Sequence, residues 1–266
     1  ELTLRMAELS AALGEAGRAA TGRNPDEPWR QFLNLILLEL GGEGDYTARQ
    51  LAAELELLMS SLEAAGARRI AACDVAPILR LVRSFGFHLA SLDIRQNSAF
   101  HDRAIAQLLE VAGLEGGDYP AWPKDRRLEL LRRELASPRP FAGVTSTLGP
   151  EAQATVGVLR LVQEHVARRG PEGIGTLIVS MTRDETDLLN VYLLGREAGL
   201  VRHTPEGLVS DVPVTPLFET IDDLARSGAV LPAFLDHPVT RRTLEALRVR
   251  DGRERPLQDV MIGYSD

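Results

Sequence analysis

Three charged residues, Arg95, Glu219 and Asp266, lie at the ends of apolar segments that have the character of β-strands. In parallel α/β folds, ligands bind at the carboxyl ends of the strands, so these side chains can converge there. Two carboxylates with water suit a hard, octahedral Mg²⁺ ion, and a guanidinium offers a planar fork of donors for a phosphate or carboxylate. A polar residue after a strand can instead cap the following helix, as we expect for Thr182 and Thr220.

Four apolar segments are predicted to be the strands that position these residues. Helical segments separate them, which indicates parallel βα units, and their near-continuous apolar character indicates that both faces are covered. Such units fit either an open doubly wound sheet or part of a (β/α)₈ barrel, and periodicity leaves both open. The four predicted strands are residues 87–94, 176–181, 212–218 and 259–264.

Residues 1–84 are predicted to form a helical block, followed by the α/β region over residues 85–266. In the block, apolar residues recur at helical spacing between breaks rich in Gly and Pro. Thr47 is expected to cap the third helix and Asp74 the fourth.

Other polar residues are expected to have structural roles only. Residues 182–185 resemble a capping box for a helix over 188–198. The basic segment 126–133 alternates with Leu at helical spacing, which predicts a solvated helix face. His88 is expected in the core of the first strand, and the single cysteine, Cys73, is expected to be buried.

Composition narrows the class of protein. The 266 residues are 44% hydrophobic and 26% charged, as in globular proteins, and the net charge of −8 argues against nucleic-acid binding. One cysteine cannot form an internal disulfide, and the sequence has neither a membrane-spanning apolar run nor a signal peptide. We therefore expect a cytoplasmic protein with no membrane partner. Both ends have the character of cuts in a longer chain.

The same residues lie in motifs that resemble the phosphoenolpyruvate carboxylase family. Residues 85–98 resemble F-G-x-x-L-x-x-L-D-I-R-Q-E-S, with Asn97 in place of the usual Glu. Residues 214–224 follow V-P-L-F-E-T-x-x-D-L, and residues 261–266 are the opening of M-I-G-Y-S-D-S-x-K-D-x-G. The matches are colinear from residue 27 to residue 266.

The resemblance implies a (β/α)₈ TIM-type barrel embedded in extra helices. It implies that Glu219 and Asp266 bind Mg²⁺, with Mn²⁺ as a substitute, and that Arg95 is catalytic and contacts the substrate phosphate. It further implies that Leu217 and Met261 line a dry pocket for CO₂, which is compatible with a place in the barrel core.

The implied activity is carboxylation of phosphoenolpyruvate by bicarbonate to oxaloacetate and phosphate, through carboxyphosphate and a Mg²⁺-stabilised enolate. This reaction fixes carbon and supplies the tricarboxylic acid cycle, and the family is usually homotetrameric. The family's T-A-H-P-T-E segment and its Gly- and Arg-rich loop are absent, so we expect no turnover from this chain alone. Two alternatives are a non-catalytic regulatory or interaction module derived from this family, and another Mg²⁺-dependent phosphoenolpyruvate or pyruvate barrel enzyme.

Overall fold

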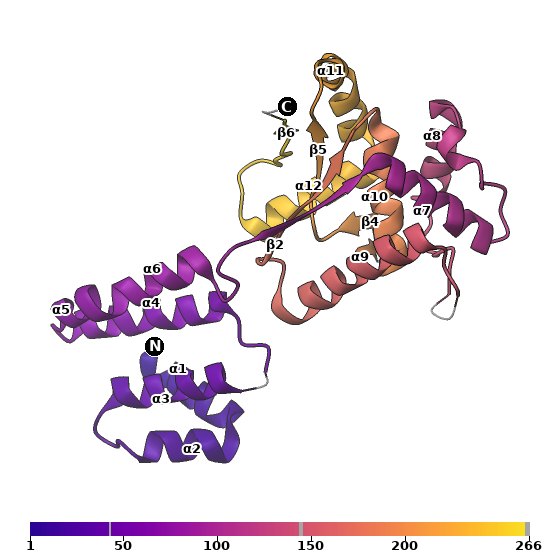
Figure 1. Cartoon of the computed structure of the whole chain (residues 1–266). Helices are drawn as coiled ribbons and strands as arrows, with labels where there is room; N and C mark the ends of the chain where they lie inside the picture. The colour runs from indigo at the N-terminus through magenta and orange to yellow at the C-terminus, as the bar shows by residue number, and fades with distance from the viewer. Residues whose placement is uncertain (43, 144–145, 264–266) are drawn as a thin grey trace. The chain divides into compact units, whose positions relative to one another are not determined.

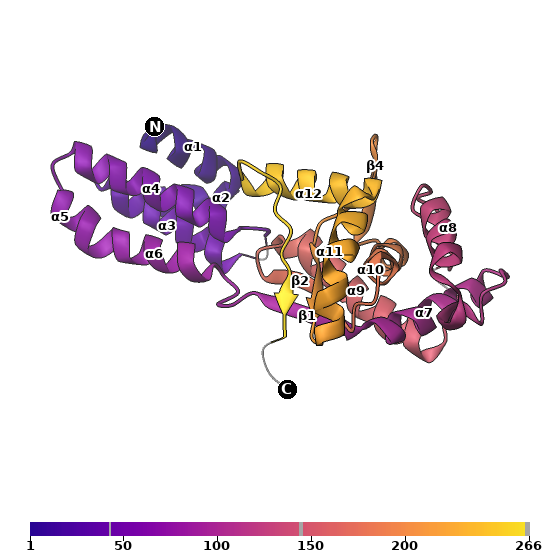
Figure 2. The same ribbon diagram turned by 90° about the horizontal axis from the view of Figure 1, so that it is seen from above.

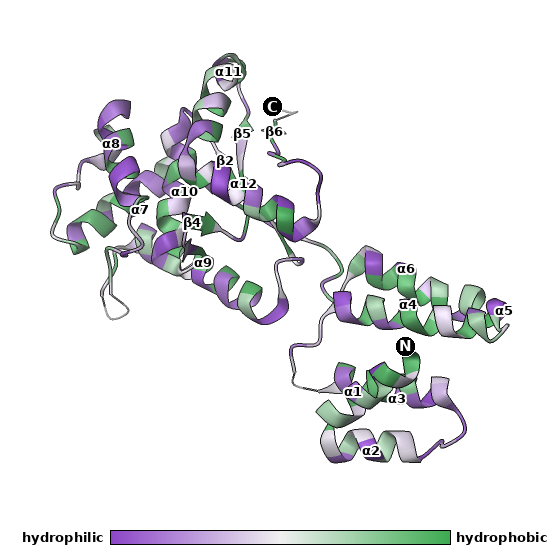
Figure 3. Ribbon diagram, turned by 180° about the vertical axis from the view of Figure 1, so that it is seen from behind, coloured by the Kyte–Doolittle hydropathy of each residue, from purple (hydrophilic) through white to green (hydrophobic). Residues whose placement is uncertain are grey.

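The buried apolar residues gather into two separate cores, one in each of two units (Figures 1 and 3). The computed structural model describes residues 1–42, 44–143 and 146–263. The first unit is Glu1–Ala90 and the second is Ser91–Asp266.

The first unit is helical, as predicted. Thr47 caps α4 in a capping box with Gln50, so that prediction is confirmed. The core of the unit includes Phe32, Leu35 and Leu58. Its helices are α1 (Leu2–Ala12), α2 (Gly14–Gly22), α3 (Pro28–Gly41), α4 (Ala48–Ala64), α5 (Arg68–Ile70), the π-helix η1 (Ala71–Val75) and α6 (Ala76–Phe85).

Asp74 does not cap a helix, so that prediction was wrong. It lies inside η1, in a helical run that continues from α5 into α6. Ala71, Val75 and Leu79 are buried at four-residue spacing along this run. Cys73 lies off that stripe and is exposed, which corrects the prediction that it is buried.

The second unit is a mixed α/β structure built on a parallel sheet of four strands in the order β1-β2-β5-β6. The order of the strands in the sheet follows their order in the chain. The elements are β1 (Leu92–Asn97), α7 (Ser98–Val111), η2 (Tyr119–Ala121), α8 (Lys124–Glu134), α9 (Pro150–Arg169), β2 (Ile174–Ser180), α10 (Glu185–Ala198), β3 (Val201–Thr204), β4 (Gly207–Ser210), β5 (Val214–Phe218), α11 (Ile221–Asp236), α12 (Pro238–Asp251) and β6 (Met261–Ile262).

Helices α7, α9 and α10 pack against one another beside the sheet (Figure 2). Every residue of α10 is buried, from Glu185 to Ala198, so this helix is the centre of the unit. Between α10 and β5 the chain forms an antiparallel hairpin, β3–β4, which the sequence analysis did not predict.

The first strand begins later than predicted. Gly86 and Leu89 both have positive φ, and the Leu89 N–H donates to the Phe85 carbonyl at 2.8 Å, so the chain turns before it extends. His88 therefore lies half-buried in this turn rather than in the core of a strand. The strand starts at Leu92 and includes Arg95 in its interior.

None of the helices over the described ranges is long and apolar enough to cross a membrane.

Candidate functional site at the sheet

Arg95 and Glu219 form an ion pair, in which Arg95 Nη2 donates to Glu219 Oε1. Arg95 lies on β1, and Glu219 directly follows β5, two strands away in the sheet. The Arg95 side chain is about half exposed and that of Glu219 about one quarter, so a ligand can reach both. The structure therefore brings together two of the three charged residues that the sequence analysis selected.

The start of α11 fixes the backbone of Glu219. Thr220 caps this helix, as predicted, in a capping box with Asp223. The Asp223 carboxylate accepts the Glu219 N–H at 3.3 Å and the Thr220 N–H at 3.0 Å. Burial would raise the pKa of Asp223, but hydrogen bonds from Thr220 and Glu219 and from the Arg226 side chain bring it below the usual range. A buried, ionised carboxylate thus holds the segment that carries Glu219.

Strand β6 brings the end of the described chain beside Glu219. Gly263 donates its N–H to the Phe218 carbonyl at 2.9 Å. A Cβ atom built at position 263 would lie 3.2 Å from Glu219 Cγ. The third charged residue, Asp266, lies outside the described residues, so its predicted role as a metal ligand stays a prediction.

Leu217 and Met261 are register partners on β5 and β6. Leu217 is 1% exposed, whereas Met261 is 42% exposed. The structure therefore places them side by side but in different environments, and their role in lining a CO₂ pocket stays a prediction.

Glu219 offers a hard carboxylate oxygen of the kind that Mg²⁺ prefers. One of its two oxygens accepts from Arg95. In the part of the chain that the structure describes, no group of three or more His, Cys, Asp or Glu side chains could hold a metal ion. Of the two predicted metal ligands, Glu219 is therefore the one that lies within the described residues.

Two other polar residues near strands lie away from the candidate site or have a role other than the expected one. Asp93 lies near the amino end of β1 and accepts the Thr176 N–H at 3.0 Å, so it is remote from the carboxyl ends. Thr182 donates to the Val179 carbonyl at 2.8 Å and caps nothing. Asp184 caps α10 instead, by accepting the Thr186 N–H.

A buried ionic network supports the loop between β2 and α10. Arg183 Nη2 lies 2.6 Å from Asp102 Oδ2 and 2.6 Å from Asp187 Oδ1. Arg127 Nη1 lies 3.3 Å from Asp102 Oδ1, and Asn190 donates to the same oxygen at 3.0 Å. Helices α7, α8 and α10 are therefore joined beneath this loop.

The pKa values of the charged side chains in this network depend on the opposite charges beside them. Burial raises the pKa of Asp187, and Arg183 opposes that rise. Hydrogen bonds to Asp187 and Asp102 raise the pKa of Arg183 above its ordinary value, against the effect of its burial. Each charge is stabilised by the opposite charges around it.

This network was not predicted, because its members are far apart in the chain. The solvated face predicted for residues 126–133 is wrong for Arg127, since that residue is buried. A usable signal was present in α10, where Asp187 and Asn190 interrupt an otherwise apolar segment. A polar residue on a fully buried helix must find a partner.

These features define an α/β protein whose parallel sheet carries a paired Arg and Glu. A family model described as phosphoenolpyruvate carboxylase matches residues 18–266. The chain belongs to the phosphoenolpyruvate carboxylase family.

Three curated relatives share this name. One from Nocardia farcinica (strain IFM 10152) is 36% identical and matches all of this chain and 30% of its own length. One from Rhodothermus marinus is 39% identical over 84% of this chain and 24% of its own length. One from Rhodopseudomonas palustris (strain BisA53) is 41% identical over 82% of this chain and 22% of its own length. The chain thus spans less than a third of the length of these relatives.

Proposed function

We propose that this chain is the part of a phosphoenolpyruvate carboxylase that carries a phosphate-binding arginine and a metal-binding glutamate. The complete enzyme converts phosphoenolpyruvate and bicarbonate to oxaloacetate and phosphate. The observation that carries the proposal is the pairing of Arg95 with Glu219, two residues that lie in separate family motifs and meet in space.

Arg95 binds the phosphate of phosphoenolpyruvate. Its guanidinium is half-exposed, and its planar set of donors matches phosphate oxygens. Its contact with Glu219 supplies a counter-charge and holds the long side chain in one direction. The phosphate therefore meets a donor group whose position is already set, which lowers the entropic cost of binding.

The reaction proceeds in two steps. A bicarbonate oxygen bonds to phosphorus while the bond from phosphorus to the enol oxygen breaks, which gives carboxyphosphate and the enolate of pyruvate. Carboxyphosphate then separates into CO₂ and phosphate, and the enolate carbon bonds to CO₂. Leu217 and Met261 exclude water near this carbon, so that the enolate is not protonated.

Glu219 and Asp266 would hold Mg²⁺, with Mn²⁺ as a substitute. The donor set supports this, because both side chains are carboxylates with hard oxygen atoms. When bound, the ion supplies a fixed positive charge beside the substrate oxygens.

The sheet belongs to a (β/α)₈ barrel. Support comes from the strand order β1-β2-β5-β6, which follows the chain without reversal. Doubly wound sheets reverse their strand order at a switch point, whereas barrel strands follow one another around the sheet. The homotetramer of the family is a separate proposal that light scattering of the complete protein tests.

The decisive experiment is an oxaloacetate assay on the complete enzyme that contains this segment. The unaltered enzyme should require Mg²⁺ or Mn²⁺, and Glu219→Gln should lower kcat/KM by about a hundredfold or more, because charge stabilisation at the site is lost. Glu254→Gln is the matched control, since Glu254 is exposed after α12 and should leave activity unchanged. A non-catalytic module of the same family would form no oxaloacetate even with Glu219 intact.

A further inference from the structure

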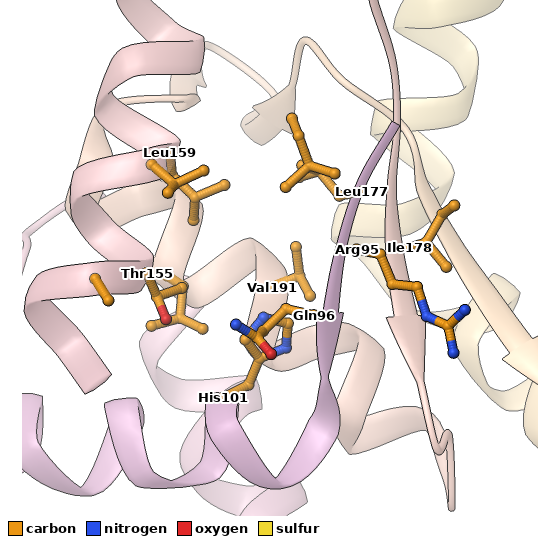
Figure 4. Close-up of a pocket in the computed structure, with 12 residues that line it drawn as sticks. Arg95, Gln96, His101, Thr155, Leu159, Leu177, Ile178 and Val191 are labelled. Atoms are coloured by element: carbon orange, nitrogen blue, oxygen red, sulfur yellow. The ribbon is translucent and has the colours of Figure 1, made fainter. Parts of the chain in front are cut away.

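A cavity of about 140 Å³ lies between strands β1 and β2 and helices α7, α9 and α10 (Figure 4). Its apolar walls include Leu159, Leu177 and Val191. His101 of α7 and Thr155 of α9 add polar atoms to the lining. Gln96 and Arg95 of β1 also belong to the lining, so the cavity is mostly apolar with a few polar groups, which is the usual composition of a small-molecule site.

Two of the polar side chains in the lining, His101 and Thr155, each have an atom without a partner in the described part of the chain. Neither His101 Nδ1 nor Thr155 Oγ1 has a hydrogen-bond partner among the described residues. The two residues are 6% and 8% exposed, so water around the protein does not satisfy them. Buried polar atoms almost always have a partner, and leaving one unpaired is costly. A bound molecule inside the cavity would supply the hydrogen-bond partners that the protein does not.

The cavity favours a neutral occupant. Burial lowers the pKa of His101 to about 4, so its imidazole is uncharged near neutral pH. The charged residue among those lining the cavity is Arg95, and Figure 4 shows its side chain pointing away from His101. That guanidinium is paired with Glu219. Neither an anion nor a cation would find an opposite charge here.

A hydroxyl group fits the two unpaired atoms. One nitrogen of a neutral imidazole donates and the other accepts, and a hydroxyl can do either. A hydroxyl on the occupant can therefore satisfy His101 Nδ1 in either tautomer, and a hydroxyl is equally suited to exchange a hydrogen bond with Thr155 Oγ1. The volume is close to that of an engineered cavity of about 150 Å³ that binds benzene.

We propose that this cavity binds a small neutral molecule, about the size of a six-membered ring, that carries one hydroxyl group. Arg95 belongs to the lining, but its guanidinium points away from His101 and pairs with Glu219, because neighbouring residues of β1 face opposite ways. The proposal concerns binding by this chain and does not depend on carboxylase activity.

The test uses the full 266-residue chain with phenol and benzene as probes, followed by NMR titration. Phenol should bind saturably and shift the signals of His101 and Thr155, with an affinity about threefold to tenfold above that of benzene, as one hydrogen bond provides. Phenol that causes no saturable shift, because water alone occupies the cavity, would overturn the proposal.

Two variants locate the binding. Thr155→Val keeps the shape of the side chain and removes its hydroxyl. It should therefore weaken the binding of phenol and leave the binding of benzene unchanged. Ala154→Phe adds a ring from an exposed lining position of α9 and should abolish binding of both probes. Thr21→Val, in the first unit, is the control and should bind as the unaltered chain does. Equal phenol binding by all three variants would mean that phenol binds elsewhere.

Discussion

Gly263 lies beside Glu219, close enough that a side chain at position 263 would crowd it. A Cβ atom at position 263 would lie 3.0 Å from Glu219 Cα, which is tighter than nine in ten real contacts of this kind. The hydrogen bond from Gly263 to Phe218 holds the two strands at this separation. A side chain at position 263 would therefore push on the residue that we propose as a metal ligand.

Gly263→Ala should displace Glu219 by a few tenths of an ångström and destabilise the second unit by about 1 kcal/mol, as overpacking does. In the complete enzyme, kcat/KM should fall about tenfold. The measurements are thermal unfolding and the oxaloacetate assay. Gly228→Ala is the control, because nothing lies within 4 Å of its added Cβ and it is in the interior of α11. It should stabilise the unit by about 0.5–1 kcal/mol. If both variants behave alike, the close contact has no effect.

Arg95→Lys keeps the charge and removes the planar fork of donors. We expect the KM for phosphoenolpyruvate to rise about tenfold, because a lysine cannot bind the phosphate in the same bidentate way. Arg241→Lys is the matched control, since Arg241 of α12 forms an exposed pair with Asp236 at the end of α11. An unchanged KM in Arg95→Lys would contradict the proposal that Arg95 binds the substrate phosphate.

Asp102→Ala should be strongly destabilising. It leaves the buried Arg127 with the more distant Asp187 carboxylate, 3.6 Å away, and takes one of the two carboxylates from Arg183. Removing one partner of a buried pair costs up to about 3–5 kcal/mol. Urea unfolding of the chain measures the change. Asp236→Ala removes an exposed pair and should change stability by no more than the experimental error. Similar stabilities for the two variants would show that the buried network contributes little.

The stability of the second unit should fall in mild acid. The folded pKa of His101 is about 4, below its ordinary value of 6.5, so the unfolded chain binds a proton that the folded chain does not. The contribution of the uncharged His101 to the free energy of unfolding is therefore complete above pH 6.5. It decreases as the pH falls toward 4, by at most about 3 kcal/mol. His237, with a pKa lowered to about 4 by burial and by Arg132 and Arg242, acts in the same direction.

Urea unfolding at pH 7 and pH 5 checks this expectation. The unaltered chain should lose about 2 kcal/mol from His101 over this interval. His101→Met, which cannot titrate, should show a smaller loss. An equal loss in the variant would assign the pH dependence to other residues.

The order of helices and strands in the second unit was largely predictable, because long apolar periodicity and strong end signals agree there. Helix α9 is observed as Pro150–Arg169, with Gly on either side. The helix expected over residues 188–198 is observed as α10, which ends at Gly199 with positive φ. The hairpin β3–β4 was missed because its strands have four residues each, too few for alternation to stand out.

The start of β1 was mispredicted for a different reason. The segment 87–94 is largely apolar, as a buried strand is, but the turn at Gly86 and the left-handed backbone of Leu89 decide the conformation. The left-handed backbone of Leu89 cannot be predicted from the residue types.

The candidate site was predictable in part. Arg95 and Glu219 were found because each lies in a distinctive motif near the end of an apolar segment. The buried network of Asp102, Arg127 and Asp187 was not, because burial of a charge depends on helices that are distant in sequence. A basic helix with regularly spaced leucines has the same pattern whether or not one arginine turns inward.

The sheet has β1 and β6 as its outermost strands, and in the described residues each pairs on one side only. Main-chain groups along an open strand edge recruit further strands, either from the same polypeptide or from another molecule. In solution this chain should therefore self-associate as its concentration rises. Further strands of a longer polypeptide would pair with the same groups and close the sheet. Closure would therefore prevent this self-association and also fix the distance between Arg95 and Glu219.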